Sequence, residues 1–135
     1  MLTPREVECL LVIYLAGDLV SPSDLAGEMG ITRVSALEML RRLSEKGCGD
    51  YIERRGLILN EHGRKLAENH IRKHRLIETF LHRSLAMPLE DACREARRID
   101  YYMSDDAVER MDAILGHPGR CPHGYPIPEV KEVRP

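Results

Sequence analysis

The feature that most constrains the fold is a short helical segment, a tight glycine turn and a longer helical segment in direct succession. The first is "SPSDLAGEMG", residues 21–30, which begins with serine caps and ends at Gly30. The second is "ITRVSALEMLRRLSEKG", residues 31–47, with Thr32 as its N-cap and Gly47 at its end. A connection of about three residues around Gly30 is typical of a helix-turn-helix.

The flanking segments predict a winged version of this motif. Thr3 and Pro4 suit the N-cap and first position of an earlier helix, which runs to Gly17. After the motif, residues 51–53 and 57–59 alternate as two strands do. Arg54-Arg55-Gly56 between them is typical of a hairpin turn, so two strands with a basic tip follow the helix-turn-helix.

The rest of the chain predicts further helices and places the protein in the mainly α class. A long helix is expected over residues 61–85, a second from Pro88, and a third from Ser104 to Gly116. A Pro/Gly-rich tail follows. We therefore expect a winged helix-turn-helix domain over residues 1–68, a helical domain over 69–118, and a tail over 119–135.

The charge is distributed unevenly, although the whole chain carries only −2. From Thr32 to Arg75 eleven Lys and Arg oppose six Asp and Glu, a balance of +5. After Arg75 eight Lys and Arg oppose eleven Asp and Glu, a balance of −3. A basic segment beside an acidic one suggests one part that faces phosphates and another with a different role.

The second helix of the motif is expected to enter the major groove of DNA, with its N-terminal residues towards the bases. Arg33 could bind guanine bidentately, and Glu38 could accept from cytosine. The apolar side of this helix is expected at Val34, Leu37 and the leucines that follow. The predicted DNA-binding set is Thr32, Arg33, Ser35, Ala36, Glu38, Met39, Arg41, Arg42, Arg54 and Arg55, with Thr32, Ser35 and the last four on phosphates.

Two later segments carry residue types that bind metals. His74 and Glu78 lie one turn apart on the long helix. In "ACREARRIDYYMSDD", a helix from about Leu89 would put Cys93, Arg97, Asp100 and Tyr101 on one face. Histidine, carboxylate and thiolate together suit zinc, iron(II) or cobalt. "CPHG" at residues 121–124 has no second Cys-His pair nearby, so we interpret it as a tail that packs on the domain.

Several stretches taken together resemble the diphtheria-toxin-repressor-like regulators, which include iron- and manganese-dependent repressors. They are "VIYL", "LAGEMGITRVSALEMLRRLSEKG", "LNEHGRKLA", "RKHRLIETFL", "MSDD" and "CPHGYPIP". The resemblance covers nearly the whole chain, and the sequence stops where some members add an SH3-like domain. It implies a winged helix, a helical dimerisation domain and metal sites where the two meet.

The resemblance assigns metal-ligand positions, and some of them hold unsuitable residues. Glu8 and Asp100 stand at primary-site ligand positions, and His74, Glu78 and Cys93 stand at an ancillary-type site. Arg97 and Tyr101, however, replace the usual ligands at two primary-site positions. Arginine stays protonated and has no lone pair to offer, so we predict a degenerate primary site.

Our hypothesis is that the Arg97 guanidinium takes the place of the primary-site ion between Glu8 and Asp100. The alternative is that Arg97 and Arg98 are ordinary solvent-exposed charges. The expected cofactor is a divalent transition metal, iron(II), manganese or zinc, with a metal-free protein as the alternative.

The expected function is a transcriptional regulator, a repressor of metal-homeostasis genes, that binds a palindromic operator as a homodimer. The alternatives are a metal-independent or redox-responsive regulator and a winged helix that binds proteins. No Gly-rich phosphate loop or nucleophile elbow occurs, so an enzyme is not expected. The longest apolar run, from Cys9, is short for a membrane span, and a cytoplasmic protein is expected.

Overall fold

The computed structural model describes residues 1–130 and shows a mainly helical chain with one small sheet, as the sequence predicts. The chain divides into two compact units. The first unit covers Met1–Ala67, and the second begins at Glu68 and includes the tail that was expected to be a separate segment. The boundary falls within the long helix α4, Glu61–Ser84.

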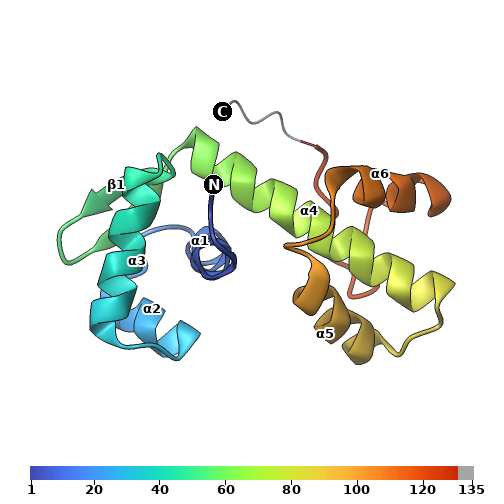
Figure 1. Cartoon of the computed structure of the whole chain (residues 1–135), viewed down its shortest axis with the longest axis horizontal. Coiled ribbons are helices and arrows are strands. Elements are labelled where there is room, and N and C mark those ends of the chain that lie inside the picture. The colour runs from blue at the N-terminus through green and yellow to red at the C-terminus, as the bar shows by residue number, and fades with distance from the viewer. Residues whose placement is uncertain (131–135) are drawn as a thin grey trace. The chain divides into compact units, whose positions relative to one another are not determined.

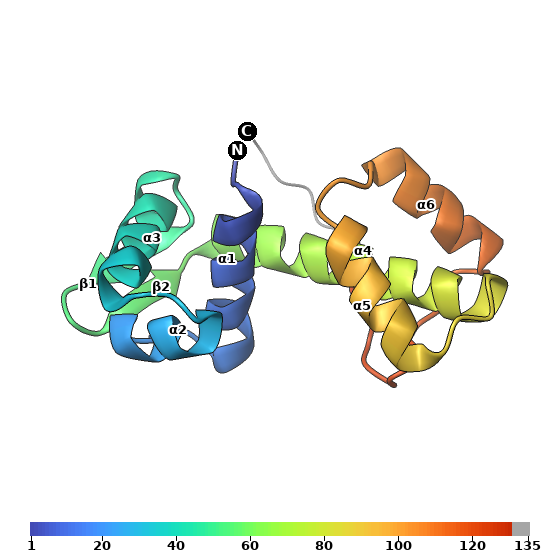
Figure 2. The ribbon, with the colours of Figure 1, turned by 60° about the horizontal axis from the view of Figure 1, so that its bottom comes forward.

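The helices of the first unit begin at the caps that the sequence predicts. They are α1 (Pro4–Ala16), α2 (Pro22–Met29) and α3 (Arg33–Glu45). Each begins directly after a hydroxyl residue, Thr3, Ser21 or Thr32, whose side chain accepts a hydrogen bond from a backbone N–H of the first turn. Figure 1 shows the three helices beside the hairpin, and Figure 2 shows the same unit turned.

The hairpin consists of β1 (Gly49–Ile52) and β2 (Gly56–Leu59), which pair antiparallel with Gly49 opposite Leu59 and Ile52 opposite Gly56. Glu53, which was expected in the first strand, belongs to the turn instead. The backbone N–H of Arg55 donates to the carbonyl of Ile52 at 3.0 Å, which closes the turn after β1. Arg54 between them has a φ of 65°, so the wing tip presents its arginines on a sharp turn.

The core of the first unit lies between its helices and the hairpin. Its buried residues include Leu10, Ile13, Leu25, Leu40, Leu43, Leu57 and Ala67. The first turn of α4 approaches the hairpin closely, because a Cβ atom added at Gly63 would lie 2.2 Å from the carbonyl oxygen of Cys48. Asp18 accepts from the backbone N–H of Leu59 at 3.1 Å, which ties the loop after α1 to the wing.

In the second unit, α5 (Leu89–Ile99) and α6 (Asp105–Ile114) pack on the later part of α4. The buried residues between them are Leu76, Ile77, Leu81, Ala92, Ala96, Val108, Cys121 and Ile127. The predicted face of four residues on α5 is wrong in part. The helix ends at Ile99, so Asp100 is its C-cap and Tyr101 lies in the turn that follows.

The tail packs on the second unit, as expected from its prolines. Arg72 of α4 donates to the carbonyl of Pro128 at 3.0 Å, and Arg75 donates to that of Pro126 at 2.5 Å. The Arg75 guanidinium also lies over the Tyr125 ring. Residues 131–135 of the predicted tail lie outside the described residues. Within residues 1–130, no helix combines the length and the apolar character needed to cross a membrane.

Candidate functional site

The predicted DNA-contacting face of α3 divides into exposed and buried residues. Thr32, Arg33, Glu38, Arg41 and Arg42 are exposed, as are Arg54 and Arg55 at the wing tip, and Ser35 is half-buried. Two predicted contacts are corrected here: Ala36 and Met39 are buried against the core of the first unit. They lie on the inward side of α3, so they support the helix and are not free to touch a base.

For Val34 the error is the reverse, because it was expected to be buried and is exposed. It was placed on the apolar side of the helix, but its side chain is 67% exposed. Val34 lines a surface hollow of ≈ 310 Å³ together with Pro22, Arg33, Leu37, Tyr51, Glu53 and Arg54. An exposed valine between Arg33 and the wing can contact a thymine methyl, which is the apolar mark of an A·T pair in the major groove.

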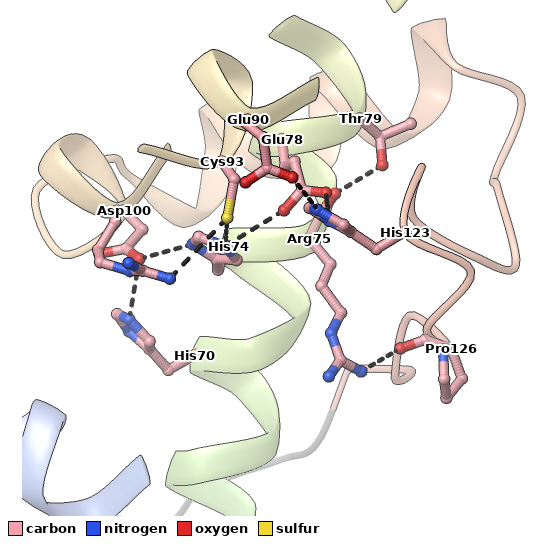
Figure 3. A network of polar contacts seen from close by, with 11 residues as sticks. His70, His74, Arg75, Glu78, Thr79, Glu90, Cys93, Asp100, His123 and Pro126 are labelled. Carbon is pink, nitrogen blue, oxygen red and sulfur yellow. Dashed lines mark hydrogen bonds and ion pairs between the residues drawn. The ribbon is translucent and has the colours of Figure 1, made fainter. Parts of the chain in front are cut away.

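The polar centre of the second unit is a chain of alternating imidazole and carboxylate groups (Figure 3). The Asp100 carboxylate lies 3.3 Å from His70 Nε2 and 3.1 Å from His74 Nδ1. The other nitrogen of His74 lies 3.3 Å from Glu78 Oε2. Glu78 Oε1 is 2.7 Å from His123 Nδ1. Three segments of the second unit therefore meet here: α4, the C-cap of α5 and the tail.

Two groups of candidate metal donors overlap in this centre. His74, Glu78 and Cys93 form one, and Glu78, Cys121 and His123 form the other. In each group one donor atom per residue lies within 4.8 Å of the other two. The sequence therefore predicted the residues of the first group, and the structure brings them together.

The interpretation of "CPHG" as a tail that packs on the domain agrees with the structure, but Cys121 and His123 also lie close to a third candidate donor. The missing partner is Glu78, 45 residues from His123 along the chain. A local spacing rule searches for a second Cys-His pair and misses a donor that long-range packing supplies. The sequence did contain one signal for this group, because Cys121 and His123 are two possible metal ligands with no third ligand near them in the sequence.

The electrostatics of the centre differ from residue to residue. Burial alone would raise the pKa of Asp100, but hydrogen bonds from His70 and His74 outweigh burial and lower it to about 2. Burial raises the pKa of the Cys93 thiol, and the nearby Glu78 charge raises it further. The hydrogen bond to Glu78 raises the pKa of His123. Metal binding at Cys93 must therefore displace a proton from the thiol.

The residues of the predicted primary site have other contacts. Glu8 of α1 pairs with Arg5 at 2.6 Å within the first unit. Arg97 is exposed and lies 3.9 Å from Cys93 Sγ. The Asp100 carboxylate is held by the two histidines. The bridge from Glu8 through Arg97 to Asp100 stays a prediction.

The donor chemistry of the cluster fits a transition metal. Imidazole nitrogen, thiolate and carboxylate together suit zinc and iron(II), whereas manganese prefers oxygen donors. Within residues 1–130, no buried side-chain nitrogen or oxygen lacks a hydrogen-bond partner. The nitrogen and oxygen donors of the cluster thus pair with one another, and the same atoms would hold an ion together with the thiol.

Fold and site together define a winged-helix chain with a metal-type donor cluster in its helical unit. Residues 1–57 match "Iron dependent repressor, N-terminal DNA binding domain". Residues 60–129 match "Iron dependent repressor, metal binding and dimerisation domain". The chain belongs to the iron-dependent repressor family.

Individual relatives agree with this assignment. The iron-dependent repressor IdeR of Mycobacterium tuberculosis (strain ATCC 25618 / H37Rv) is 40% identical over 79 residues, which are 58% of this chain and 34% of that protein. The transcriptional regulator MntR of Escherichia coli O157:H7 is 30% identical over 86 residues, 64% of this chain and 55% of that protein.

A solved structure described as a manganese-dependent transcriptional repressor complex with manganese is also similar. It superposes with a TM-score of 0.83 at 37% identity, over 92% of this chain and 58% of that one. This chain therefore spans from about a third to somewhat over half of the relatives described here.

Proposed function

We propose that this protein is a metal-responsive transcriptional repressor that binds double-stranded DNA as a homodimer and controls genes of metal homeostasis. The observation that carries the proposal is the donor cluster His74, Glu78 and Cys93 in the unit that follows a winged helix. A metal bound there is the signal, and the basic winged helix is the element that acts on DNA. Such a repressor works in the cytoplasm.

The first unit supplies a surface suited to DNA. Arg33 lies at the start of the recognition helix, and Arg41 and Arg42 are exposed farther along it. Arg54 and Arg55 project from the wing tip. Arginines at these places can bind one groove and the adjoining phosphates, which give affinity and register.

The second unit supplies apolar surface for a dimer. Leu85, Tyr102 and Ile114 are 58%, 75% and 73% exposed. Apolar surface of this kind is covered by a partner when it forms one contiguous patch, and the unit matches a dimerisation domain. A two-fold dimer presents two recognition helices, so a palindromic operator with half-sites about one helical turn apart, or a multiple of it, is the expected target.

The test is to select operators from random-sequence duplexes with zinc, iron(II) or manganese present, and then to measure affinity by fluorescence anisotropy. We expect a palindromic consensus, tighter binding with metal than with chelator, and a steep loss of affinity with salt. Arg33→Ala should lose specificity, and Arg42→Ala should weaken all duplexes and lower the salt slope by about 1. Salt-independent or absent DNA binding would contradict the proposal and favour a protein-binding winged helix.

One observation favours a second candidate, a metal-independent regulator. Arg97 occupies a ligand position of the family resemblance, and a guanidinium does not bind metals. If Arg97 replaces the ion, the parent binds its operator equally well in chelator. Arg97→Glu then loosens binding, and manganese or iron(II) restores it. Equal binding by Arg97→Glu in chelator would exclude this candidate. A redox switch is less well supported, because burial raises the pKa of the Cys93 thiol.

A further inference from the structure

Glu78 occupies an unusual place in the second unit because its two carboxylate oxygens face different histidines. Oε2 lies 3.3 Å from His74 Nε2, and Oε1 lies 2.7 Å from His123 Nδ1. The side chain is 2% exposed. Figure 3 shows His74 and His123 on either side of this carboxylate. A carboxylate with one donor group at each oxygen has the arrangement of a bridging ligand between two ions.

We propose that Glu78 bridges two divalent transition-metal ions, one bound with His74 and Cys93 and the other with Cys121 and His123. This proposal rests on the proposed metal-responsive function and deepens it. Each ion receives one imidazole nitrogen, one thiolate and one oxygen of the shared carboxylate. Three protein ligands with one open position are typical of accessible zinc sites, and the open position takes water.

The second nitrogen of each histidine supports this assignment. His74 Nδ1 lies 3.1 Å from Asp100 Oδ2, and His123 Nε2 lies 3.4 Å from Glu90 Oε1. With an ion bound on each side of Glu78, these nitrogens would carry the ring proton, and His74 Nε2 and His123 Nδ1 would offer their lone pairs to the ions in place of their contacts with Glu78. A ligand histidine that donates its other N–H to a carboxylate is the usual arrangement around bound metals. It occurs here twice, once on each side of Glu78.

The two thiols come from separate elements. Cys93 of α5 has its Sγ 3.8 Å from His74 Nε2. Cys121 is 5% exposed and belongs to a turn in which Gly124 N–H donates to the Cys121 carbonyl at 2.8 Å. This turn projects His123 towards Glu78. Thiolate donors on both sides select zinc, iron(II) or cobalt over magnesium and calcium.

The tail is fixed before any ion binds. Arg72 and Arg75 hold its carbonyls at Pro128 and Pro126, and Ile127 is buried in the core of the second unit. Cys121 and His123 are therefore already held beside Glu78 of α4, and the tail need not fold when the second ion binds. Preorganised ligands lose little conformational entropy when they bind.

The charge balance is also suitable. Glu78, Cys93 and Cys121 bring three negative charges when both thiols are deprotonated, against four positive charges of two divalent ions. Asp100 and Glu90 add negative charge behind the histidines. Arg97 lies 3.9 Å from Cys93 Sγ and stabilises its thiolate from outside the coordination sphere.

The experiment uses cobalt(II) as the probe on the full chain, prepared metal-free with all thiols reduced. Cobalt(II) is titrated while thiolate-to-cobalt charge-transfer absorption is recorded, and bound ions are counted by native mass spectrometry. We expect two ions per chain in the parent. Cys93→Ala and Cys121→Ala should each retain one ion and about half of the absorption. Cys48→Ala, which removes a buried thiol of the first unit, should keep two.

A histidine pair gives an independent comparison. His123→Ala should lose the second ion, whereas His117→Ala should keep both, because His117 contacts Asp112 away from the cluster. Glu78→Gln removes the bridging charge and should lower the ion count below two. Far-UV circular dichroism establishes which variants fold. If Glu78→Gln does not fold, His123→Ala still tests the second ion, because His123 is exposed and its removal leaves the core intact.

One ion per chain in the folded parent would overturn the bridged centre. Two ions in Cys121→Ala and His123→Ala would overturn it as well, because the second ion would then lie elsewhere. Neither result decides the proposed function. That function fails if DNA binding is absent or independent of salt, or if operator affinity with metal equals operator affinity in chelator, and anisotropy on the same preparations measures this separately.

Discussion

Asp100→Asn tests whether the imidazole–carboxylate chain of the second unit stabilises the fold. The substitution keeps the shape of the side chain and an oxygen that can accept from a histidine, but it removes the charge. In the parent, burial opposes ionisation, and hydrogen bonds from His70 and His74 overcome it, so the pKa of Asp100 falls from 3.8 to about 2. Such a change corresponds to about 2 kcal/mol of folding free energy at neutral pH, since one pKa unit equals roughly 1.4 kcal/mol.

The pH dependence of this effect has a definite sign. The pKa of Asp100 is lower in the folded state, so its stabilisation is complete above its ordinary value of 3.8 and disappears as the pH falls through about 2. The contribution of Asp100 ionisation to the difference in unfolding free energy between the parent and Asp100→Asn should therefore be constant from pH 7 to pH 5. It should narrow between pH 4 and pH 2.

The assay is urea unfolding in the presence of a chelator, so that no bound ion contributes. A loss of about 2 kcal/mol lowers the midpoint by roughly 1 M urea for a small domain. Amide hydrogen exchange then locates the loss, which should appear in α5 and the later part of α4. Segments within Met1–Ala67 serve as the internal reference.

A matched control separates the buried charge from carboxylates in general. Asp91 on the same helix α5 pairs with Arg94, and its side chain is 47% exposed. Asp91→Asn should change stability by less than about 1 kcal/mol, because water screens an exposed ion pair. If Asp100→Asn is as stable as the parent at pH 7, or if it differs no more than Asp91→Asn, the histidines do not stabilise the carboxylate.

The remaining predictions concern local packing. Thr32→Ala removes the cap that accepts from Ser35 N–H and should destabilise the first unit by about 1 kcal/mol; an unchanged thermal midpoint would contradict it. Gly63→Ala places a methyl group 2.2 Å from the Cys48 carbonyl oxygen and should cost about 1–3 kcal/mol, whereas Gly27→Ala, with open space around it, should be neutral or stabilising in the same urea titration. Arg72→Met removes the donor to the tail and should cost about 2 kcal/mol, with faster amide exchange at Ile127 as the sign that the tail has loosened.

The sequence predicts the helices well because their ends depend on local chemistry. A threonine or serine that caps the first turn, a proline after it and a glycine beyond the last turn determine a helix end within a few residues. All three signals are present at α1 and α2, whereas α3 has the threonine cap and the glycine but no proline. No glycine follows the last turn of α5, so its C-terminal end lacks this signal, and the predicted extension to Asp100 and Tyr101 is wrong.

Burial on the recognition helix is harder to predict because helical phase alone decides it. Ala36 and Val34 are both small and apolar, and they lie two positions apart on α3. One is fully buried and the other is 67% exposed. Residues two apart lie on nearly opposite sides of a helix, so an error of about one position in the assumed inward direction is enough to misassign both. That is the reason for the opposite corrections at these two residues.

The metal cluster shows which part of a site needs tertiary structure. His74 and Glu78 are one turn apart, so their common face follows from the sequence. Cys93 was assigned by family resemblance. The approach of His123 to Glu78 depends on how the tail folds back over α4. The spacing of residues along the sequence does not predict this fold. Sequence reasoning therefore recovers donors on one helix and misses donors that a loop brings from far along the chain.

The bridged centre also gives a physical reason for the arginine that first made a metal role doubtful. Arg97 cannot be a ligand, and its contact is the sulfur of Cys93 at 3.9 Å. A guanidinium beside a thiolate lowers the cost of holding that negative charge on a partly buried residue. Every donor of the bridged centre belongs to the second unit. An arginine that removes one ligand position can therefore support metal binding at a neighbouring cysteine. The loss of a primary-site ligand does not by itself imply the loss of metal response.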